Sequence, residues 1–390
     1  MSEYRVYELA EVCSRLSSGK GIPASKVTPE GNYPVYGGNG LRGYTEQSNF
    51  SGDCAIIGRQ GAFCGNVRYF SGEAYMTEHA VVVCATPEHN TRYLAYLLST
   101  MNLGRLSGQS AQPGLSVKTL GKQQISLPTL DTQNRVASIL ARLDEKIELN
   151  NHINENLLEQ IRTICTAWLS DYEPFDGVVP SDWIETPLSD IAEFFSGYSY
   201  KGAELTDSTI AMATIKNFDR KGGFKLDGYK EIVPSSKLKD SQHANMFDTL
   251  VAHTDLTQNA EVIGNAEPVM SKSEYEDIIF SMDLVKVLPK KNGVSKFLIA
   301  AILQDKRFKA HCLGYVNGTT VLHLSKKALP EYKLFLPSDF STLKALDDIV
   351  TALYKQISSN ISENTYLEKV RDSLLPKLMS GELDMSNIEI

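Results

Sequence analysis

The feature that most constrains this chain is a polar helical pattern that occurs twice, about two hundred residues apart. The first copy contains NENLLEQIR at Asn154–Arg162, and the second contains SENTYLEKVR at Ser362–Arg371. In each copy, apolar residues and asparagines recur at alternating steps of three and four, so they would form one narrow stripe along a helix. This is the spacing of helices that pair along such a stripe. Each copy also follows a Leu-Pro dipeptide. We therefore expect long helices over residues 131–172 and 341–380.

Both predicted stripes carry two asparagines at their centres, Asn150 and Asn154 in the first and Asn360 and Asn364 in the second. A polar residue in such a stripe costs stability and is tolerated where it fixes register or partner choice. We therefore predict that the helices pair with each other as an antiparallel coiled coil. The alternative is a surface helix whose asparagines face water. The residues predicted to form the pairing are Leu143, Ile147, Asn150, Asn154, Leu157, Ile161, Leu353, Ile357, Asn360, Asn364, Leu367 and Leu374.

The segments that precede the two helices, residues 1–130 and 181–338, also share an order of patterns. Each opens with a short amphipathic stretch and continues with β-like runs broken by Gly, Asn and Asp. A helical pattern follows, at Thr91–Thr100 and from Ser295 onward, and then a Gly-rich stretch. A repeat of about 200 residues is far longer than a solenoid repeat, so a duplicated domain is the better interpretation. The predicted fold is α+β, with two pseudo-repeated globular heads that are each followed by a long helix.

Charge and composition describe a globular protein without a strongly basic balance. The formal net charge is −8. The two helical segments together carry −9 and the two heads together +1, so one local basic face on a head could still bind DNA. The start of the chain has no basic region followed by an apolar core, and we expect no signal peptide. The six cysteines form no Cys-x-x-Cys pair, which favours reduced thiols in a cytoplasmic protein over a zinc site.

The order head–helix–head–helix, together with the amino-acid sequences of the helices and of several turns, resembles the specificity subunit of type I restriction–modification systems. The resemblance is carried by Leu127–Pro174, by EKVRDSLLPKLMSGELD at Glu368–Asp384, and by turns such as YPVYGGNGLRGY at Tyr33–Tyr44, SAQPGLS at Ser110–Ser116 and TDLTQ at Thr254–Gln258. It implies that each head is a target-recognition domain that reads one half of a split double-stranded DNA target. It also implies that the helices act as a spacer and dock modification (methyltransferase) subunits, two of them, with restriction (translocase–nuclease) subunits added for cleavage. The second head lacks the YGGNG turn, which weakens any transfer of individual residue roles.

The first head contains G-x-G-x-x-G at Gly38, Gly40 and Gly43, the spacing of a dinucleotide-binding fingerprint. That fingerprint needs a strand before it and a helix after it, whereas a loop and a strand are expected here. We therefore favour a glycine turn within a β-rich region over a nucleotide site. A turn that brings Asn39 and Arg42 to a DNA groove remains open as a third interpretation.

Base reading is expected from Arg, Asn, Gln and Lys on glycine-supported loops, because Arg pairs bidentately with guanine and Asn or Gln with adenine. For any one of these residues, a plain loop position or a phosphate contact is an equal alternative. The candidates in the first head are Asn39, Arg42, Arg59, Gln60, Gln109 and Gln112. Those in the second head are Lys216, Asn217, Thr254, Gln258, Asn259, Tyr315 and Asn317.

No catalytic residues are predicted. We find no Asn/Asp-Pro-Pro-aromatic motif of the kind that positions an amino group for methyl transfer, and the seven histidines are scattered. By resemblance, S-adenosylmethionine, ATP and Mg²⁺ act in partner subunits, and we expect no metal or cofactor on this chain. The competing hypothesis from another class is a non-enzymatic scaffold whose duplicated heads bind proteins, which the overall acidity favours. An enzyme with an unrecognised site is the third and weakest interpretation.

Overall fold

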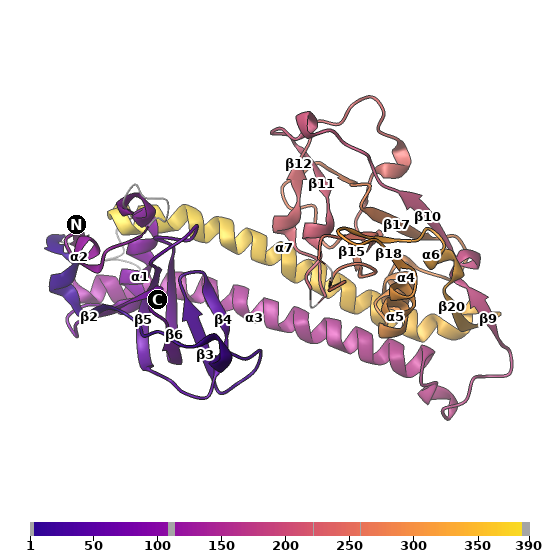
Figure 1. Ribbon diagram of the computed structural model, residues 1–390, viewed down its shortest axis with the longest axis horizontal. Helices are drawn as coiled ribbons and strands as arrows, with labels where there is room; N and C mark the ends of the chain where they lie inside the picture. The colour runs from indigo at the N-terminus through magenta and orange to yellow at the C-terminus, as the bar shows by residue number, and fades with distance from the viewer. Residues whose placement is uncertain (1–3, 108–113, 221, 258, 384–390) are drawn as a thin grey trace. The chain divides into compact units, whose positions relative to one another are not determined.

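The computed structural model describes residues 4–107, 114–220, 222–257 and 259–383 (Figure 1). The chain divides into two compact units, Met1–Lys146 with Leu367–Ile390 as unit 1, and Ile147–Tyr366 as unit 2. The long helices are α3, Leu130–Leu169, and α7, Lys344–Ser380. Against the expected ranges, α3 begins one residue earlier and ends three earlier, and α7 begins three residues later. Each unit therefore contains one head and a part of each long helix.

The head of unit 1 is built on a six-stranded sheet with the order β2-β7-β5-β6-β3-β4. A separate antiparallel pair, β1 with β8, precedes α3. Because β3 lies parallel to the end of β6, two segments far apart in sequence meet in the middle of the sheet. The elements are β1 (Arg5–Glu8), β2 (Cys13–Ser18), β3 (Tyr33–Gly37), β4 (Gly40–Thr45), β5 (Phe50–Gly58), β6 (Val67–Met76), β7 (Ala80–Ala85), α1 (Thr91–Thr100), α2 (Val117–Gly121) and β8 (Gln124–Leu127).

The head of unit 2 distributes its strands over several smaller sheets. Their orders are β10-β17-β13-β15, β12-β11-β16, β14-β19-β18 and β20-β9. The strands are β9 (Trp183–Pro187), β10 (Ala192–Ser196), β11 (Ile210–Ala213), β12 (Lys230–Glu231), β13 (Thr249–Ala252), β14 (Thr254–Asp255), β15 (Ala266–Pro268), β16 (Asp277–Phe280), β17 (Leu284–Pro289), β18 (Val316–Asn317), β19 (Leu322–Leu324) and β20 (Lys333–Pro337). The helices are α4 (Lys296–Leu303), α5 (Lys306–Leu313) and α6 (Ala328–Glu331).

Several strand pairings of unit 1 have counterparts in unit 2. The antiparallel trio β2, β7 and β5 matches the antiparallel trio β10, β17 and β13. The parallel pair β3 and β6 matches the parallel pair β11 and β16. The pair β1 and β8 that leads into α3 matches β9 and β20, which lead into α7. Equivalent elements therefore occupy equivalent places in the chain order of the two heads.

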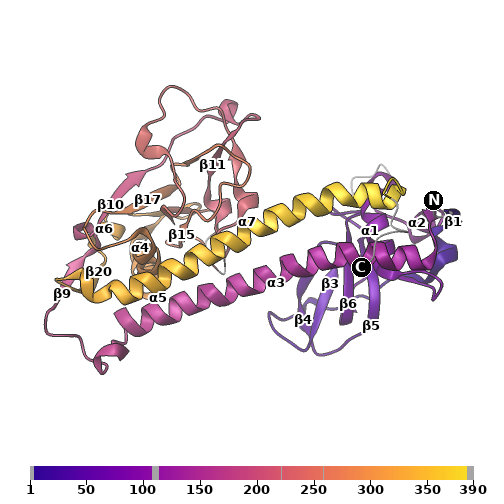
Figure 2. The same cartoon turned by 180° about the vertical axis from the view of Figure 1, so that it is seen from behind.

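Each unit has its own apolar core, and each core includes the long helices. In unit 1, Leu94 and Leu98 of α1 pack with strands β5 and β7, with Leu140 of α3, and with Leu378 of α7. In unit 2, residues 298–303 of α4 are buried in a core that also contains residues of β13, β17, α3 and α7. Both views show the C-terminal half of α3 beside the N-terminal half of α7 in this unit (Figures 1 and 2). Burying these faces is what fixes each head on its helices.

The four stripe asparagines are buried and bonded between the helices of unit 2. The Asn150 amide donates to Asn364 Oδ1 at 2.8 Å, and the Asn360 amide donates to Asn154 Oδ1 at 2.8 Å. Their exposed fractions lie between 1% and 9%, so the alternative in which these asparagines face water is wrong. Among the other residues predicted to pair, Ile147, Ile161 and Ile357 are buried. The half-buried ones are Leu143, Leu157, Leu353, Leu367 and Leu374.

The glycine motif of the first head forms a β-hairpin. Gly38 lies in the turn between β3 and β4, and Gly40 and Gly43 belong to β4 itself. No helix follows the motif, because the chain continues into β5. The dinucleotide interpretation is therefore wrong, and the glycine turn is confirmed. Within the described residues, no helix is both long enough and apolar enough to cross a lipid bilayer.

Candidate nucleic-acid interface

Four residues predicted from the sequence of the first head lie together at one edge of its sheet. Asn39 occupies the exposed β3–β4 turn, and Arg42 is exposed on β4. The turn packs closely on the residues after β5: a Cβ added at Gly38 would lie 3.6 Å from Arg59 N and 3.5 Å from Gln60 O. The hairpin, which carries Asn39 and Arg42, thus lies near the end of β5, which is followed by Arg59 and Gln60. Each of the two segments supplies one carboxamide and one guanidinium.

Backbone hydrogen bonds hold the residue after β5 from both sides. Arg59 N donates to His79 O at 2.9 Å, and Leu115 N donates to Arg59 O at 2.8 Å. The loop that follows is closed by Gly65 N donating to Gly58 O at 2.8 Å and by Gly58 N donating to Asn66 O at 2.9 Å. We call these four bonds the ladder of unit 1. The ladder itself uses main-chain atoms only. The Arg59 side chain is half-buried and its Nη1 donates to Glu78 O at 3.5 Å, whereas Gln60 is exposed.

Unit 2 contains a ladder of the same four bonds. His253 N donates to Asp283 O at 2.8 Å, and Leu324 N donates to His253 O at 2.9 Å. Gly264 N donates to Ala252 O at 2.8 Å, and Ala252 N donates to Asn265 O at 2.9 Å. By these bonds His253 corresponds to Arg59 of unit 1, and the residue after it, Thr254, corresponds to Gln60. The main chain is arranged alike in the two units, whereas the side chains on it differ.

The predicted residues of the second head separate into two groups. Thr254, on β14, is buried and donates to Asp283 Oδ1 at 3.1 Å, and Asn317 lies on β18 of the same small sheet. Between them lies His323 of β19, exposed and paired with both. Lys216 and Asn259 are exposed on two loops outside this sheet.

Besides Thr254, further predicted side chains of the second head use their polar groups within the protein, among them Asn317, whose amide donates to Tyr315 O at 3.3 Å. Asn217 is fully buried, its Oδ1 accepts from Thr214 N at 2.8 Å, and its amide donates to Lys225 O at 2.7 Å. These bonds give Asn217 a structural role in the turn. The Tyr315 hydroxyl donates to Glu331 at 2.7 Å. Gln109, Gln112 and Gln258 lie outside the described residues.

Sequence reasoning missed Arg68 and His323. Arg68 is exposed on β6, and its guanidinium would lie 3.2–3.4 Å from a Cβ at Gly40, so it covers the base of the β3–β4 turn. Both residues are placed by strand pairing, which the sequence alone did not supply. His253 lies beside His323, and burial, with His323 and Lys326 nearby, lowers the pKa of its imidazole. His253 is therefore a neutral hydrogen-bonding group at pH 7.

A polar groove of about 1140 Å³ borders the candidate residues of unit 2. It lies between the loop after β11, the loop after β14 and α3. The cations that line it are Arg162, Lys216, Arg220 and Lys225, and the carboxylates are Glu155, Asp219, Asp227, Asp255 and Glu261. Because the two signs are almost balanced, the groove offers many directional donors and acceptors and little net attraction for an anion.

The thiols of four cysteines have pKa values well above the ordinary value of a thiol. Burial raises the pKa of the Cys13, Cys54, Cys165 and Cys312 thiols to about 12. A thiol with such a pKa is protonated at neutral pH and is a poor nucleophile. No cluster of three or more His, Cys, Asp or Glu that could hold a metal ion occurs in the part of the chain that the structure describes. Amide, guanidinium and hydroxyl groups at the two ladders support recognition by hydrogen bonding.

Residues 1–159 match the family model described as type I restriction modification DNA specificity domain. A region of 133 residues is 41% identical to the type I restriction enzyme EcoprrI specificity subunit of Escherichia coli, covering 34% of this chain and 32% of that protein. A longer match, 23% identical over 323 residues, covers 76% of this chain and 70% of the MjaIX specificity subunit of Methanocaldococcus jannaschii. The chain thus spans about a third of the first of these relatives and 70% of the second.

A solved structure has the same fold over nearly the whole chain. The type I restriction–modification S subunit from M. genitalium aligns with a TM-score of 0.57 and 18% identity, over 97% of this chain and 96% of that one. Residues 1–159 are thus similar to type I restriction modification DNA specificity domains, and the chain over most of its length is similar to type I restriction enzyme specificity subunits.

Proposed function

We propose that this chain is the DNA sequence-specificity subunit of a type I restriction–modification complex in the cytoplasm. Each head reads one half of a bipartite double-stranded target. The long helices dock modification subunits, two per complex, and restriction subunits join for cleavage. The chain itself is non-catalytic: S-adenosylmethionine, ATP and Mg²⁺ act in its partners.

One observation carries this proposal: the four-bond ladder occurs in both units with different side chains on it. Arg59 and Gln60 follow β5 in unit 1, and His253 and Thr254 follow β13 in unit 2. A protein that reads two unlike DNA elements needs two frames of the same shape that present different donors and acceptors. Duplicated heads that bound one identical partner twice would need the same side chains on both frames.

The candidates proposed to contact DNA, which are exposed except for the half-buried Arg59, divide by chemistry. Asn39, Arg42, Arg59 and Gln60 can read base edges in the major groove, because guanidinium and carboxamide groups form bidentate pairs with guanine and adenine. Lys216, Asn259 and Asn317 are the exposed counterparts in unit 2. In this proposal Asn217 and Tyr315 shape their loops, since their polar groups are bonded within the protein. Arg68 and Lys225 contact phosphates, which sets affinity and salt dependence.

We further propose that the chain is a duplicated domain and that its two long helices pair as an antiparallel coiled coil. The corresponding strand pairings of the two heads support the duplication. The pairing is supported within unit 2 by the asparagine bonds, where residue numbers rise along α3 as they fall along α7. In unit 1, Arg371 of α7 bonds Asp144 of α3 at 3.0 Å, which continues the same sense. Paired helices give partner subunits a rigid surface to dock on.

The test is duplex binding by the chain assembled with its modification subunits. Duplexes are first selected from a random pool, and each half of the selected sequence is then changed separately. We expect a specific affinity at least about a thousandfold above the affinity for random duplex, and a steep loss of affinity with added salt. Equal affinity for all duplexes would contradict the proposal and would favour the scaffold hypothesis, in which the heads bind proteins.

A further inference from the structure

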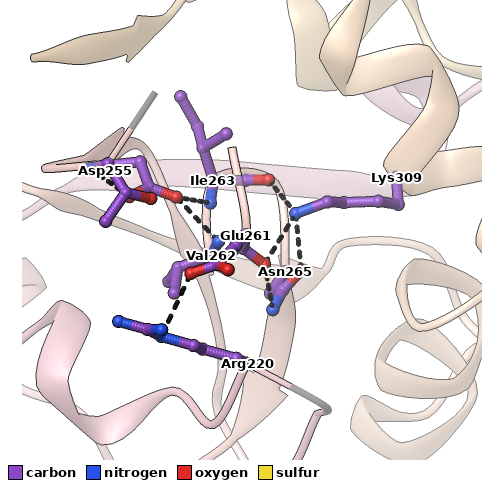
Figure 3. A network of polar contacts seen from close by, with 8 residues as sticks. Arg220, Asp255, Glu261, Val262, Ile263, Asn265 and Lys309 are labelled. Atoms are coloured by element: carbon purple, nitrogen blue, oxygen red, sulfur yellow. Dashed lines mark hydrogen bonds and ion pairs between the residues drawn. The ribbon is translucent and has the colours of Figure 1, made fainter. Parts of the chain in front are cut away.

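The loop that follows β14 in unit 2, which the structure describes at residues 256, 257 and 259–262, is held by two charged side chains that lie outside it. Asp255 precedes the loop on β14, and Lys309 reaches it from α5 (Figure 3). The loop carries the exposed Leu256 and Asn259 and borders the polar groove. We call Asp255 and Lys309 the clamp.

Asp255 joins the two ends of the loop through one carboxylate. Oδ1 accepts from Thr257 N and from the Thr257 hydroxyl, both at 2.8 Å. Oδ2 accepts from Val262 N at 2.7 Å and from Ile263 N at 3.2 Å. Burial alone raises the pKa of this carboxyl, but the four hydrogen bonds lower it to below its ordinary value. The buried carboxylate is therefore ionised at neutral pH and fully occupied by the loop.

Lys309 holds the carbonyl side of the same segment. Its ammonium donates to Glu261 O at 3.3 Å, to Ile263 O and to Asn265 Oδ1 at 2.8 Å. These three acceptors match the three donors of an ammonium group. Between them, the clamp residues bond backbone groups of three consecutive residues, Glu261, Val262 and Ile263. The N–H of the next residue, Gly264, belongs to the ladder. Among the described side chains of the loop, the Thr257 hydroxyl takes part in this bonding, and Glu261 pairs outside the clamp with Arg220 at 3.1 Å.

We propose that Asp255 and Lys309 are positioning residues that fix the described residues of this loop, 256, 257 and 259–262, in one conformation, so that unit 2 discriminates its half of the DNA target. This inference rests on the proposed function. The physical reason is pre-organisation: a loop already fixed loses less conformational entropy on binding, and a wrong base cannot be accommodated by moving the loop. Neither clamp residue needs to contact DNA, because its polar groups are used within the protein.

Two isosteric substitutions test the clamp. Asp255→Asn keeps the shape but turns an amide donor toward backbone N–H groups, and Lys309→Met keeps the aliphatic stem but removes all three donors. The matched controls are Asp207→Asn, at an exposed turn position, and Lys306→Met, three residues before Lys309 on α5. Thr257→Val is a milder variant that removes only one of the four bonds to Asp255, and it serves if the first variants do not fold.

Two readouts separate the clamp from a general effect on folding. The first is amide hydrogen exchange at Val262 and Ile263, which we expect to accelerate at least about tenfold in both clamp variants while β13 stays protected. The second is the affinity ratio between the selected duplex and duplexes with single changes, measured on the assembled complex. We expect this ratio to fall about tenfold for changes in one half of the target and to stay constant for changes in the other half.

The outcomes distinguish the inference from the function on which it rests. If the wild-type complex discriminates but the clamp variants match Asp207→Asn and Lys306→Met in both readouts, the clamp has no positioning role. Equal losses in both halves of the target would also overturn it, because the loop belongs to one head. A wild-type complex that binds all duplexes alike would refute the proposed function and the specificity role together, even if exchange at Val262 still accelerated in Asp255→Asn.

Discussion

The loops that follow β5 in unit 1 and β13 in unit 2 solve the same structural problem in different ways. Both are closed by the ladder, and in both a glycine with positive φ ends the loop, Gly65 at φ 87° and Gly264 at φ 77°. The unit 1 loop, residues 59–65, is short and is closed by backbone turns such as Cys64 N to Gly61 O at 3.0 Å. The unit 2 loop, residues 253–264, is longer and uses a carboxylate and an ammonium. Both loops end in the same backbone turn, Asn66 N to Phe63 O at 3.2 Å and Asn265 N to Val262 O at 2.8 Å, and the longer loop adds the two charged side chains to it.

A second difference lies one strand away, at positions with the same register. Arg68 of β6 pairs with Ile56 of β5, and Glu267 of β15 pairs with Leu250 of β13. Arg68 is exposed at the candidate interface, whereas Glu267 is buried, where it accepts from Gly223 N at 2.7 Å and from the Gln304 amide at 2.9 Å. The same frame thus supports a surface cation in one unit and an internal carboxyl in the other.

The largest effect is expected from alanine at the two loop-closing glycines. A Cβ at residue 65 would lie 2.2 Å from Gly104 N, which is backbone, while one at residue 264 would lie 2.7 Å from Cys312 Cβ, which is a side chain. Positive φ adds about 1–2 kcal/mol of strain at both. We expect Gly65→Ala to destabilise its unit by about 3 kcal/mol or more, and Gly264→Ala by about 2 kcal/mol. Denaturant unfolding with hydrogen exchange in β5 and β13 measures this.

The matched control is Gly202→Ala, where an added Cβ meets nothing within 4 Å. Its effect should stay within about 0.5 kcal/mol. If Gly264→Ala proved the more damaging of the two loop variants, the short loop would not depend on close backbone packing as the comparison requires.

An intermediate effect is expected from the buried carboxyl. Burial raises the pKa of Glu267 to about 7 from an ordinary value of 4.5, although Gly223 N, Arg162 and Gln304 oppose the rise. A group with a raised folded-state pKa stabilises the fold fully below its unfolded pKa, and this contribution is lost as pH rises through the folded pKa. We expect unit 2 to lose about 1–3 kcal/mol between pH 4.5 and pH 7.5 from this group. Urea unfolding against pH measures it.

Glu267→Gln should remove this part of the pH dependence, whereas Glu193→Gln, at an exposed position, should leave it in place. The unfolding of unit 1 should lack the effect, because Arg68 occupies the corresponding position. A wild-type curve parallel to that of Glu267→Gln would show that the carboxyl does not titrate in this range.

The smallest effect is expected at Arg68 and concerns binding. Because the side chain is exposed, Arg68→Met should change stability by less than about 0.5 kcal/mol. If Arg68 contacts a phosphate, its loss should weaken duplex binding about three- to tenfold, uniformly across sequences, and lower the salt slope by about one. Titrations of labelled duplex at several salt concentrations test this. An unchanged slope with altered sequence preference would assign Arg68 to base reading instead.

The sequence predicted the long helices well because their signal is local. Residues three and four apart on one stripe define a helix without reference to the rest of the chain, and Asn150, Asn154, Asn360 and Asn364 are buried as the stripe requires. The strand order was not predicted, since parallel pairs such as β3 with β6 join segments that no local pattern connects. The turn residues Asn39 and Arg42 and the strand-end residues Arg59 and Gln60 were placed on loops from glycine patterns, and the fold brings them together.

The clamp and the structural role of Asn217 could not be predicted from a local sequence pattern. Whether an asparagine reads a ligand or caps a turn depends on which backbone groups surround it, and Asn217 is surrounded by Thr214 N and Lys225 O. Lys309 is more than forty residues from the loop that it holds. One signal was available: the dipeptide Gly-Asn ends both loops, at Gly65-Asn66 and Gly264-Asn265. Aligning the two heads on it matches Arg68 with Glu267, and matching Arg59 with His253 also requires five extra residues in the second loop.

The ladder consists entirely of main-chain atoms, and this has a consequence for how the chain can change over generations. A substitution at Arg59, Gln60 or His253 changes the side chain on the ladder and leaves the four backbone hydrogen bonds in place. New side chains can therefore be selected one residue at a time, in either head, without compensating changes in the fold that positions them.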